Sequence, residues 1–182
     1  VTSITHVQGI GTFLQSPHLS FPGNPVAGEP ATIRLVFRAQ MPFVPGDNVT
    51  VVLPGFISNA VRILGHTNIS STSPADAFYF QSWTKDAAKL VLVCQEHVPA
   101  VTQVDITIPD SIGIRLPASG IKRDHVDFTI ATDSVEGVVL PIAIHRVDPV
   151  GSFGRSTQIS FSPPKAGAVS EITLRFVADM DL

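Results

Sequence analysis

The sequence has little charge, a single cysteine and no long apolar run, and each shortage argues against a class of protein. Only 15% of the 182 residues are charged, the formal net charge is -3, and the 12 basic residues are scattered. Nucleic acids and anionic membranes attract clustered Lys and Arg, so neither partner is expected. No run approaches the roughly 18 to 20 apolar residues that cross a bilayer, and the first residues lack a signal-sequence pattern. We therefore expect no membrane span.

The one cysteine, Cys94, cannot form a disulfide within the chain. It follows Leu90 and Leu92 at a spacing of two residues, which places all three on one face of a strand. This spacing predicts a small buried core residue. The alternatives are a reactive thiol or a bridge between chains.

Histidine-based chemistry has no recognisable motif. The six histidines lie at neither the H-E-x-x-H spacing nor that of a paired His/Cys zinc site, and no G-x-S-x-G elbow occurs. Glu96-His97 and Asp124-His125 are adjacent pairs. Because neighbours on a strand point to opposite faces, neither pair is expected to act as acid and base. We predict that the protein is not an enzyme and has no catalytic residues.

Calcium binding is also weakly supported. Calcium needs six to eight converging oxygen ligands. The close acidic pairs are Asp124 with Asp127 and Asp179 with Asp181, and neither lies in a dense acidic loop. We interpret them as solvated turn carboxylates, and expect no metal and no cofactor.

Residues recur along the chain, and this recurrence is the strongest signal. The segment 4–21 aligns without a gap on 144–161, 140 positions later, with seven identities in 18 positions. After a slip of one residue, the match resumes on alternate residues from Ile33 to Met41 and from Ile172 to Met180. A period of two is that of side chains on one face of a strand, so the two segments share a buried face and not a surface.

The rest of the chain favours an all-β fold. Helical periodicity is weak, while β-branched residues alternate with polar ones between turn signals such as Pro45-Gly46-Asp47-Asn48. Gly65 to Ala77 and Pro109 to Asp124 are predicted to be loops. We predict an immunoglobulin-like antiparallel β-sandwich, with strands near residues 2–8, 18–22, 31–40, 48–53, 56–63, 77–83, 89–95, 101–108, 125–131 and 138–146.

The recurrence predicts a repeat of about 140 residues and a domain order. Residues 1–8 are expected to be the last strand of a preceding repeat, 9–148 a complete domain, and 149–182 the first strands of the next. A partial sandwich has bare edges and an uncovered apolar face. The partners are therefore neighbouring repeats, either on one longer polypeptide or on separate copies that donate strands.

Two features bear on sugars. The sequons Asn48-Val49-Thr50 and Asn68-Ile69-Ser70 fall on a predicted turn and in a predicted polar loop, so Asn48 and Asn68 are candidate glycosylation sites. Trp83 and the aromatic run 78–80 could stack on a sugar. Alternation favours burial of part of that set, and hence a role in the core.

The segment from Ile33 through the Gly46-Asp47 turn to Leu53-Pro54-Gly55-Phe56 resembles the β-sandwich repeats of very large algal and protist surface glycoproteins, such as mastigoneme-type ciliary filament proteins. The resemblance implies an extracellular, glycosylated structural component of a filament or surface coat on a cell surface or ciliary appendage. The alternative function is that of an adhesin or carbohydrate-binding module.

Overall fold

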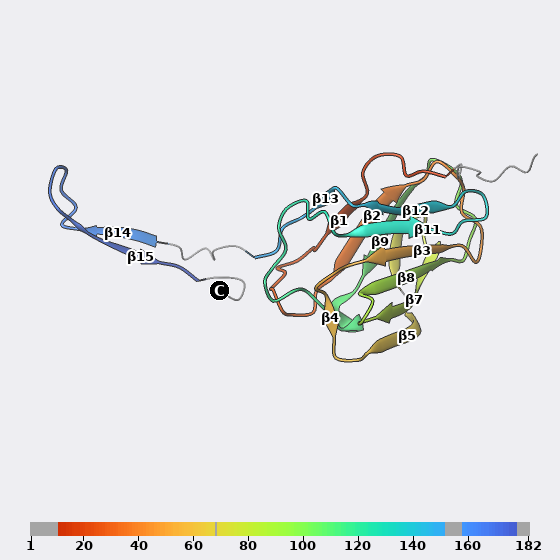
Figure 1. The fold of residues 1–182 in the computed structure, drawn as a ribbon, viewed down its shortest axis with the longest axis horizontal. Coiled ribbons are helices and arrows are strands. Elements are labelled where there is room, and N and C mark those ends of the chain that lie inside the picture. Colours follow the sequence, from red (N-terminus) through yellow and green to blue (C-terminus); the bar gives the residue numbers. More distant parts are fainter. Residues whose placement is uncertain (1–10, 68, 152–157, 178–182) are drawn as a thin grey trace, which may run out of the picture.

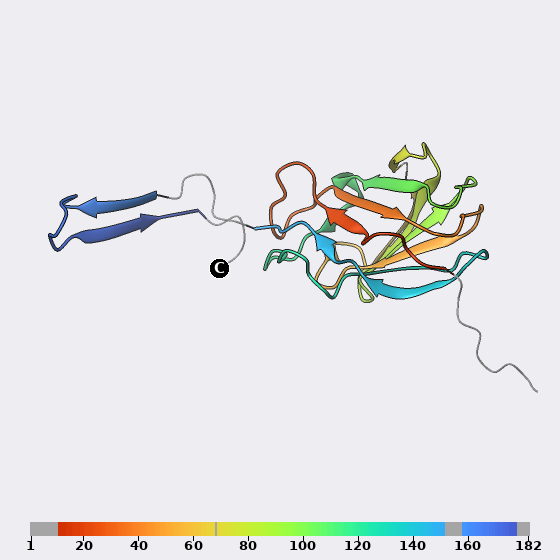
Figure 2. The same ribbon diagram turned by 90° about the horizontal axis from the view of Figure 1, so that it is seen from above.

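The computed structural model describes residues 11–67, 69–151 and 158–177, and within them the protein is all-β with no α-helix. Most strands belong to one body, and a separate hairpin near the C-terminal end stands apart from it in both ribbon views (Figures 1 and 2). The predicted all-β class is confirmed. The strand predicted within residues 1–8 lies outside the described residues.

The first large sheet joins strands from the beginning, middle and end of the body. Its strand order is β13 (Arg146–Val147), β1 (His18–Ser20), β2 (Ile33–Arg38), β9 (Gln103–Ile108) and β6 (Ser70–Ser73). All neighbours are antiparallel except β1 and β13, which run parallel.

The second large sheet faces the first across the core. Its order is β12 (Val139–Ala143), β11 (Thr129–Thr132), β3 (Asn48–Val52), β8 (Lys89–Cys94), β7 (Phe78–Thr84) and β5 (Arg62–Thr67), all antiparallel. A small sheet of β4 (Ile57–Ser58) and β10 (Ile114–Arg115) and a 3₁₀ turn at Asp110–Ile112 complete the body. The architecture is that of a β-sandwich.

Alternation along the strands builds the core. Ile33, Leu35 and Phe37 of β2 are buried, while Arg34 between them is exposed. A group of phenylalanines fills one end of the space between the sheets, with ring centroids 5.5–6.1 Å apart in edge-on geometry: Phe13, Phe37, Phe43 and Phe78. Edge-on pairs contribute about 0.5–1.5 kcal/mol each beyond the burial of their area.

The predicted turn at Pro45-Gly46-Asp47-Asn48 joins the two sheets. Gly46 has φ +100°, a conformation that favours glycine. Asp47 is buried, and its carboxylate accepts the backbone N–H of Val44 at 2.9 Å and that of Val135 at 3.2 Å. Both hydrogen bonds satisfy the buried carboxylate, and the one to Val135 ties this turn to the β11–β12 turn.

The loop prediction for residues 65–77 was wrong. The end of β5 and the whole of β6 lie there, and β6 pairs with β9 through Ser70↔Thr107 and Ser71↔Ile106. The serine-rich composition is typical of a loop, but β6 is the last strand of its sheet, where polar residues are tolerated.

Three other boundaries differ from the prediction. The strand expected over 56–63 is two strands in different sheets, β4 and β5. The strand expected over 138–146 is β12 followed by β13, between which the chain crosses from one sheet to the other at buried Ile144. The predicted loop 109–124 contains β10 and buries Ile114 and Leu116. At the crossing, the apolar run from Val138 to Ile144 continues past the end of β12, so composition does not mark the change of sheet.

Candidate functional site

The strongest candidate for a functional surface is the hairpin of β14 (Gln158–Ser162) and β15 (Glu171–Arg175), joined by residues 163–170. Ile159 lies opposite Leu174, and Phe161 opposite Ile172. Since opposite residues share a face, these four side chains form one apolar face. We call them the hairpin apolar face. The other face carries Ser160 opposite Thr173 and the remaining polar pairs.

The hairpin has the same strand register as β1 and β2. Leu19 lies opposite Leu35 in the sandwich, and Ile159 lies opposite Leu174 in the hairpin. These are the residues that the sequence recurrence aligns with each other. The other two β1–β2 pairs also have aligned counterparts in the hairpin. His18 opposite Val36 corresponds to Gln158 opposite Arg175, and Ser20 opposite Arg34 corresponds to Ser160 opposite Thr173.

The two segments differ in what covers them. Leu35 is 1% exposed and its aligned counterpart Leu174 is 58% exposed. The same holds for Leu19 at 1% against Ile159 at 57%. In the sandwich, β1 pairs with β13 and β2 pairs with β9, whereas β14 and β15 have only each other among the described strands. The hairpin apolar face and both hairpin edges are open.

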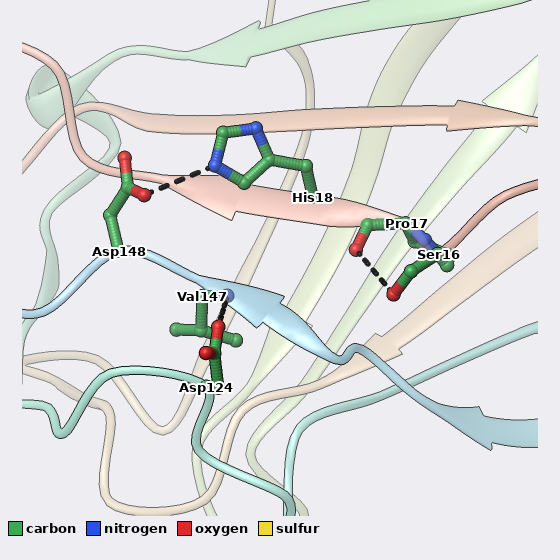
Figure 3. Close-up of polar contacts among 6 residues, drawn as sticks. All are labelled: Ser16, Pro17, His18, Asp124, Val147 and Asp148. Atoms are coloured by element: carbon green, nitrogen blue, oxygen red, sulfur yellow. Dashed lines mark hydrogen bonds and ion pairs between the residues drawn. The ribbon is translucent and has the colours of Figure 1, made fainter.

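The last strand of the sandwich, β13, is held beside its first strand, β1 (Figure 3). His18 Nε2 lies 3.2 Å from Asp148 Oδ1, and the backbone N–H of Asp148 donates to the carbonyl of Leu19 at 3.0 Å. On the other side, the N–H of Val147 donates to Asp124 Oδ1 at 3.2 Å. The last strand of the body is thus held from both sides.

The first candidate glycosylation site, Asn48, is the first residue of β3 and is half-buried. Its Nδ2 donates to Asp133 Oδ2 at 2.7 Å, and its backbone N–H donates to Asp133 Oδ1 at 2.6 Å. A glycan attached to Nδ2 leaves one N–H for this bond, so the two are compatible. Asn68 lies outside the described residues, and occupancy at both sites stays a prediction.

Cys94 is a core residue, as predicted. It is 1% exposed, and its thiol donates to the carbonyl of Glu96 at 2.9 Å. Burial raises the pKa of the Cys94 thiol to about 11. Because the thiolate is the reactive form, Cys94 in the folded protein is a poor nucleophile.

Trp83 also belongs to the core. The ring is fully buried, and Nε1 donates to Ser58 Oγ at 3.0 Å. Phe78 and Phe80 are buried on the same strand, and Tyr79 between them is half-buried. Trp83 therefore does not form a surface on which a sugar could stack.

The residues considered for catalysis or metal binding do not converge. His97 is exposed, and His125 stacks on Phe128 with centroids 4.7 Å apart. His125 Nδ1 is 3.9 Å from Asp127 Oδ2, while Asp124 holds the backbone of Val147. In the part of the chain that the structure describes, no three His, Cys, Asp or Glu side chains gather as metal ligands. Asp179 and Asp181 lie outside the described residues.

The chain was compared with known proteins, and its helix content was examined for membrane spans. No protein-family model, curated protein or solved structure matches this chain. Across residues 11–67, 69–151 and 158–177 no helix has the length and apolar character needed to traverse a bilayer.

Sequence reasoning missed one group of polar residues. Arg34 and Arg38 of β2 lie on the outer face of the five-stranded sheet beside Arg146 of β13, around a hollow. The alternation of arginines with buried residues at 33–38 indicates that Arg34 and Arg38 point outward. Only the strand order reveals that Arg146 lines the same hollow.

Proposed function

We propose that this protein is a non-catalytic structural component of an extracellular filament or surface coat, built from tandem β-sandwich repeats of about 140 residues. The observation that carries the proposal is the shared register of β1–β2 and β14–β15, with the apolar residues of one pair buried and those of the other exposed.

The hairpin apolar face would be stabilised by a second layer that covers it. A two-stranded hairpin in water is marginally stable at best. Full burial of a Leu, Ile or Phe side chain stabilises by about 1.5–3 kcal/mol. In the sandwich, the aligned side chains are covered by the six-stranded sheet, and their core cluster includes Val51, Phe80 and Leu92. An equivalent sheet is the partner that fits the hairpin.

The open edges of the hairpin would be stabilised by strands from the same kind of sandwich. Strands equivalent to β9 and β13 would pair with β15 and β14 and remove the open edges, as β9 and β13 do for β2 and β1. Repeats joined in this way form a line, which is the geometry of a filament or coat. We place the covering sheet on the same polypeptide, and strand donation by a second copy is the competing arrangement.

The extracellular setting rests on the resemblance to surface glycoprotein repeats and on the two sequons. A glycan on Asn48 would lie on the outer face of the six-stranded sheet, because Val49 and Val51 of the same strand face the core. The partners are neighbouring repeats, and the protein acts through these contacts.

A chimera tests the proposal directly. Since Met180 aligns with Met41, residues 42–151 would be appended after Met180, so that the hairpin receives the strands that follow β2 in the sandwich. We expect amide hydrogen exchange of β14 and β15 to slow by at least tenfold, because the open strands gain partners. The control carries Ile172→Asp and Leu174→Asp, which should abolish the protection.

Two results would count against the proposal. Unchanged exchange in β14 and β15, with the appended segment unfolded, would show that the hairpin is not a sandwich fragment. An intact native polypeptide of only 19.4 kDa, the mass of this chain, would exclude the single-chain array and leave strand donation.

The alternative function, an adhesin or carbohydrate-binding module, loses the support of the aromatic cluster because Trp83 is buried. Any sugar site on this domain must be sought elsewhere on the surface.

A further inference from the structure

The outer face of the five-stranded sheet is hollowed where β13, β1 and β2 lie side by side. The hollow has a volume of about 250 Å³. We call it the arginine pocket, and the polar residues around it are Gln15, Ser16, His18, Arg34, Arg38, Gln103 and Arg146. They come from four strands, β13, β1, β2 and β9, and from the segment before β1, so the folded sheet is needed to assemble them.

Two of the three arginines have no acidic partner within the described residues. Arg34 forms a bidentate pair with Asp105, at 2.9 Å from Nε and 2.5 Å from the terminal nitrogen. Asp148 contacts His18 instead of an arginine. Arg38 and Arg146 form no ion pair in the described part of the chain. The pocket therefore carries uncompensated positive charge in a protein whose formal net charge is -3.

Arg38 has an unsatisfied donor. Its Nε is buried, and no acceptor among the described residues bonds to it. A buried polar group without a partner costs about 1–3 kcal/mol, more when charged. Arg38 lines the hollow, so an oxyanion there would bond the part of its guanidinium that faces the opening, and guanidinium–oxyanion bonds are among the stronger ones in proteins.

The rest of the lining suits hydroxyl groups. Gln15 and Gln103 are exposed amides in the lining, and Ser16 also lines the hollow. Gln15 is held at φ +67°, a left-handed conformation that is uncommon outside glycine and is often found at functional positions. A volume of about 250 Å³ lies just below the 300–1,000 Å³ typical of sites for drug-sized ligands.

We propose that the arginine pocket binds one acidic sugar residue, with its carboxylate or sulfate group between Arg38 and Arg146 and its hydroxyls on the glutamines. An acidic peptide fits less well, because the hollow is only about 250 Å³ and Gln15, Ser16 and Gln103 offer amide and hydroxyl partners for the hydroxyl groups of a sugar. The ligand class is a uronate or a sulfated monosaccharide unit of a glycan.

This inference does not depend on the tandem array. The sequence recurrence aligns Arg34 with Thr173 and Arg38 with Val177, so the pocket is a property of this domain's surface and not of the shared core. Failure of the array proposal leaves it standing, and the reverse also holds.

The test is a titration of the full 182-residue chain, followed by amide and arginine Nε–H resonances. The ligands are glucuronate, glucose 6-sulfate, glucose, inorganic sulfate and an acidic tetrapeptide. We expect saturable shifts centred on Arg38 and residues 15–18 with either acidic sugar, at least tenfold stronger binding than glucose, and weaker binding as salt rises.

The variants are Arg38→Gln and Arg146→Gln, with Arg123→Gln as the matched control, because Arg123 is exposed and outside the pocket. Each pocket variant should weaken binding by at least tenfold, and the control should bind as the unmodified chain does. Arg146 is exposed, so its variant remains informative even if Arg38→Gln fails to fold.

Four results would overturn the inference. They are no saturable shift with either acidic sugar, glucose binding as tightly as glucuronate, unchanged binding in Arg146→Gln, and inorganic sulfate or the tetrapeptide binding as tightly as the acidic sugars. The last result would indicate an anion site without sugar recognition.

Discussion

The β-sandwich and the β14–β15 hairpin share an alternating pattern and a register, yet one buries its apolar residues and the other exposes them. Leu35 and Leu174 occupy aligned positions at 1% and 58% exposure. Alternation therefore specifies which face of a strand is apolar, while burial requires a second layer. The contrast can be tested at individual residues.

The largest expected difference is between Leu35→Ala and Leu174→Ala. A buried Leu→Ala change costs about 2–5 kcal/mol, because it removes apolar contacts and leaves a cavity. An exposed one stays within about 0.5 kcal/mol. Urea unfolding followed by the fluorescence of Trp83 measures the free energy of unfolding of the sandwich. Equal effects of the two changes would show that the hairpin packs on the sandwich in solution.

The second difference is a pH dependence of stability, which we expect in the sandwich and not in the hairpin. The pKa of the Cys94 thiol is raised to about 11 by burial, so the folded state holds this proton more tightly than the unfolded state. This contribution is complete below the unfolded pKa, near 8.5–9, and falls as pH rises toward 11. The loss is about 2–3 kcal/mol at 1.36 kcal/mol for each pKa unit.

Unfolding titrations from pH 8 to 11 measure this loss, with Cys94→Ala as the control in which the Cys94 contribution is absent. Exchange of the β14–β15 amides, corrected for intrinsic pH dependence, should not follow it. An identical pH profile in both proteins would contradict the burial of the thiol.

The smallest expected effect is at the junction of β13 and β1, which the hairpin lacks. The His18 and Asp148 side chains are 25% and 50% exposed, and exposed ion pairs contribute about 0–1 kcal/mol. Asp148→Asn should therefore lower stability by less than about 1 kcal/mol in the same urea experiment. A loss above 2 kcal/mol would indicate that this pair, and not the backbone bonds of β13, holds the strand.

Much of the fold was predictable from local pattern. The alternation at Ile33, Leu35 and Phe37 predicted β2 and its buried face, and the Pro45-Gly46 turn was placed correctly. Cys94 and Trp83 were correctly interpreted as core residues from their spacing. Each of these predictions depends on residues close together in the chain, where periodicity carries the signal.

Other features could not be predicted in this way. The serine-rich β6 was taken for a loop because its stability comes from pairing with β9, more than thirty residues away. The crossing at Ile144 was missed because the apolar run from Val138 to Ile144 continues past the end of β12 at Ala143. The arginine pocket was missed because β13 and β1 pair across more than 120 residues.

By itself, the sequence determined the strand class, the faces of β2 and β15, and the recurrence that aligns two hairpins in one register. Only the tertiary structure decided which of those faces is covered and which polar residues meet. The physical reason is that side-chain alternation is a local property of a strand, whereas strand order and layer packing are set by contacts between distant segments.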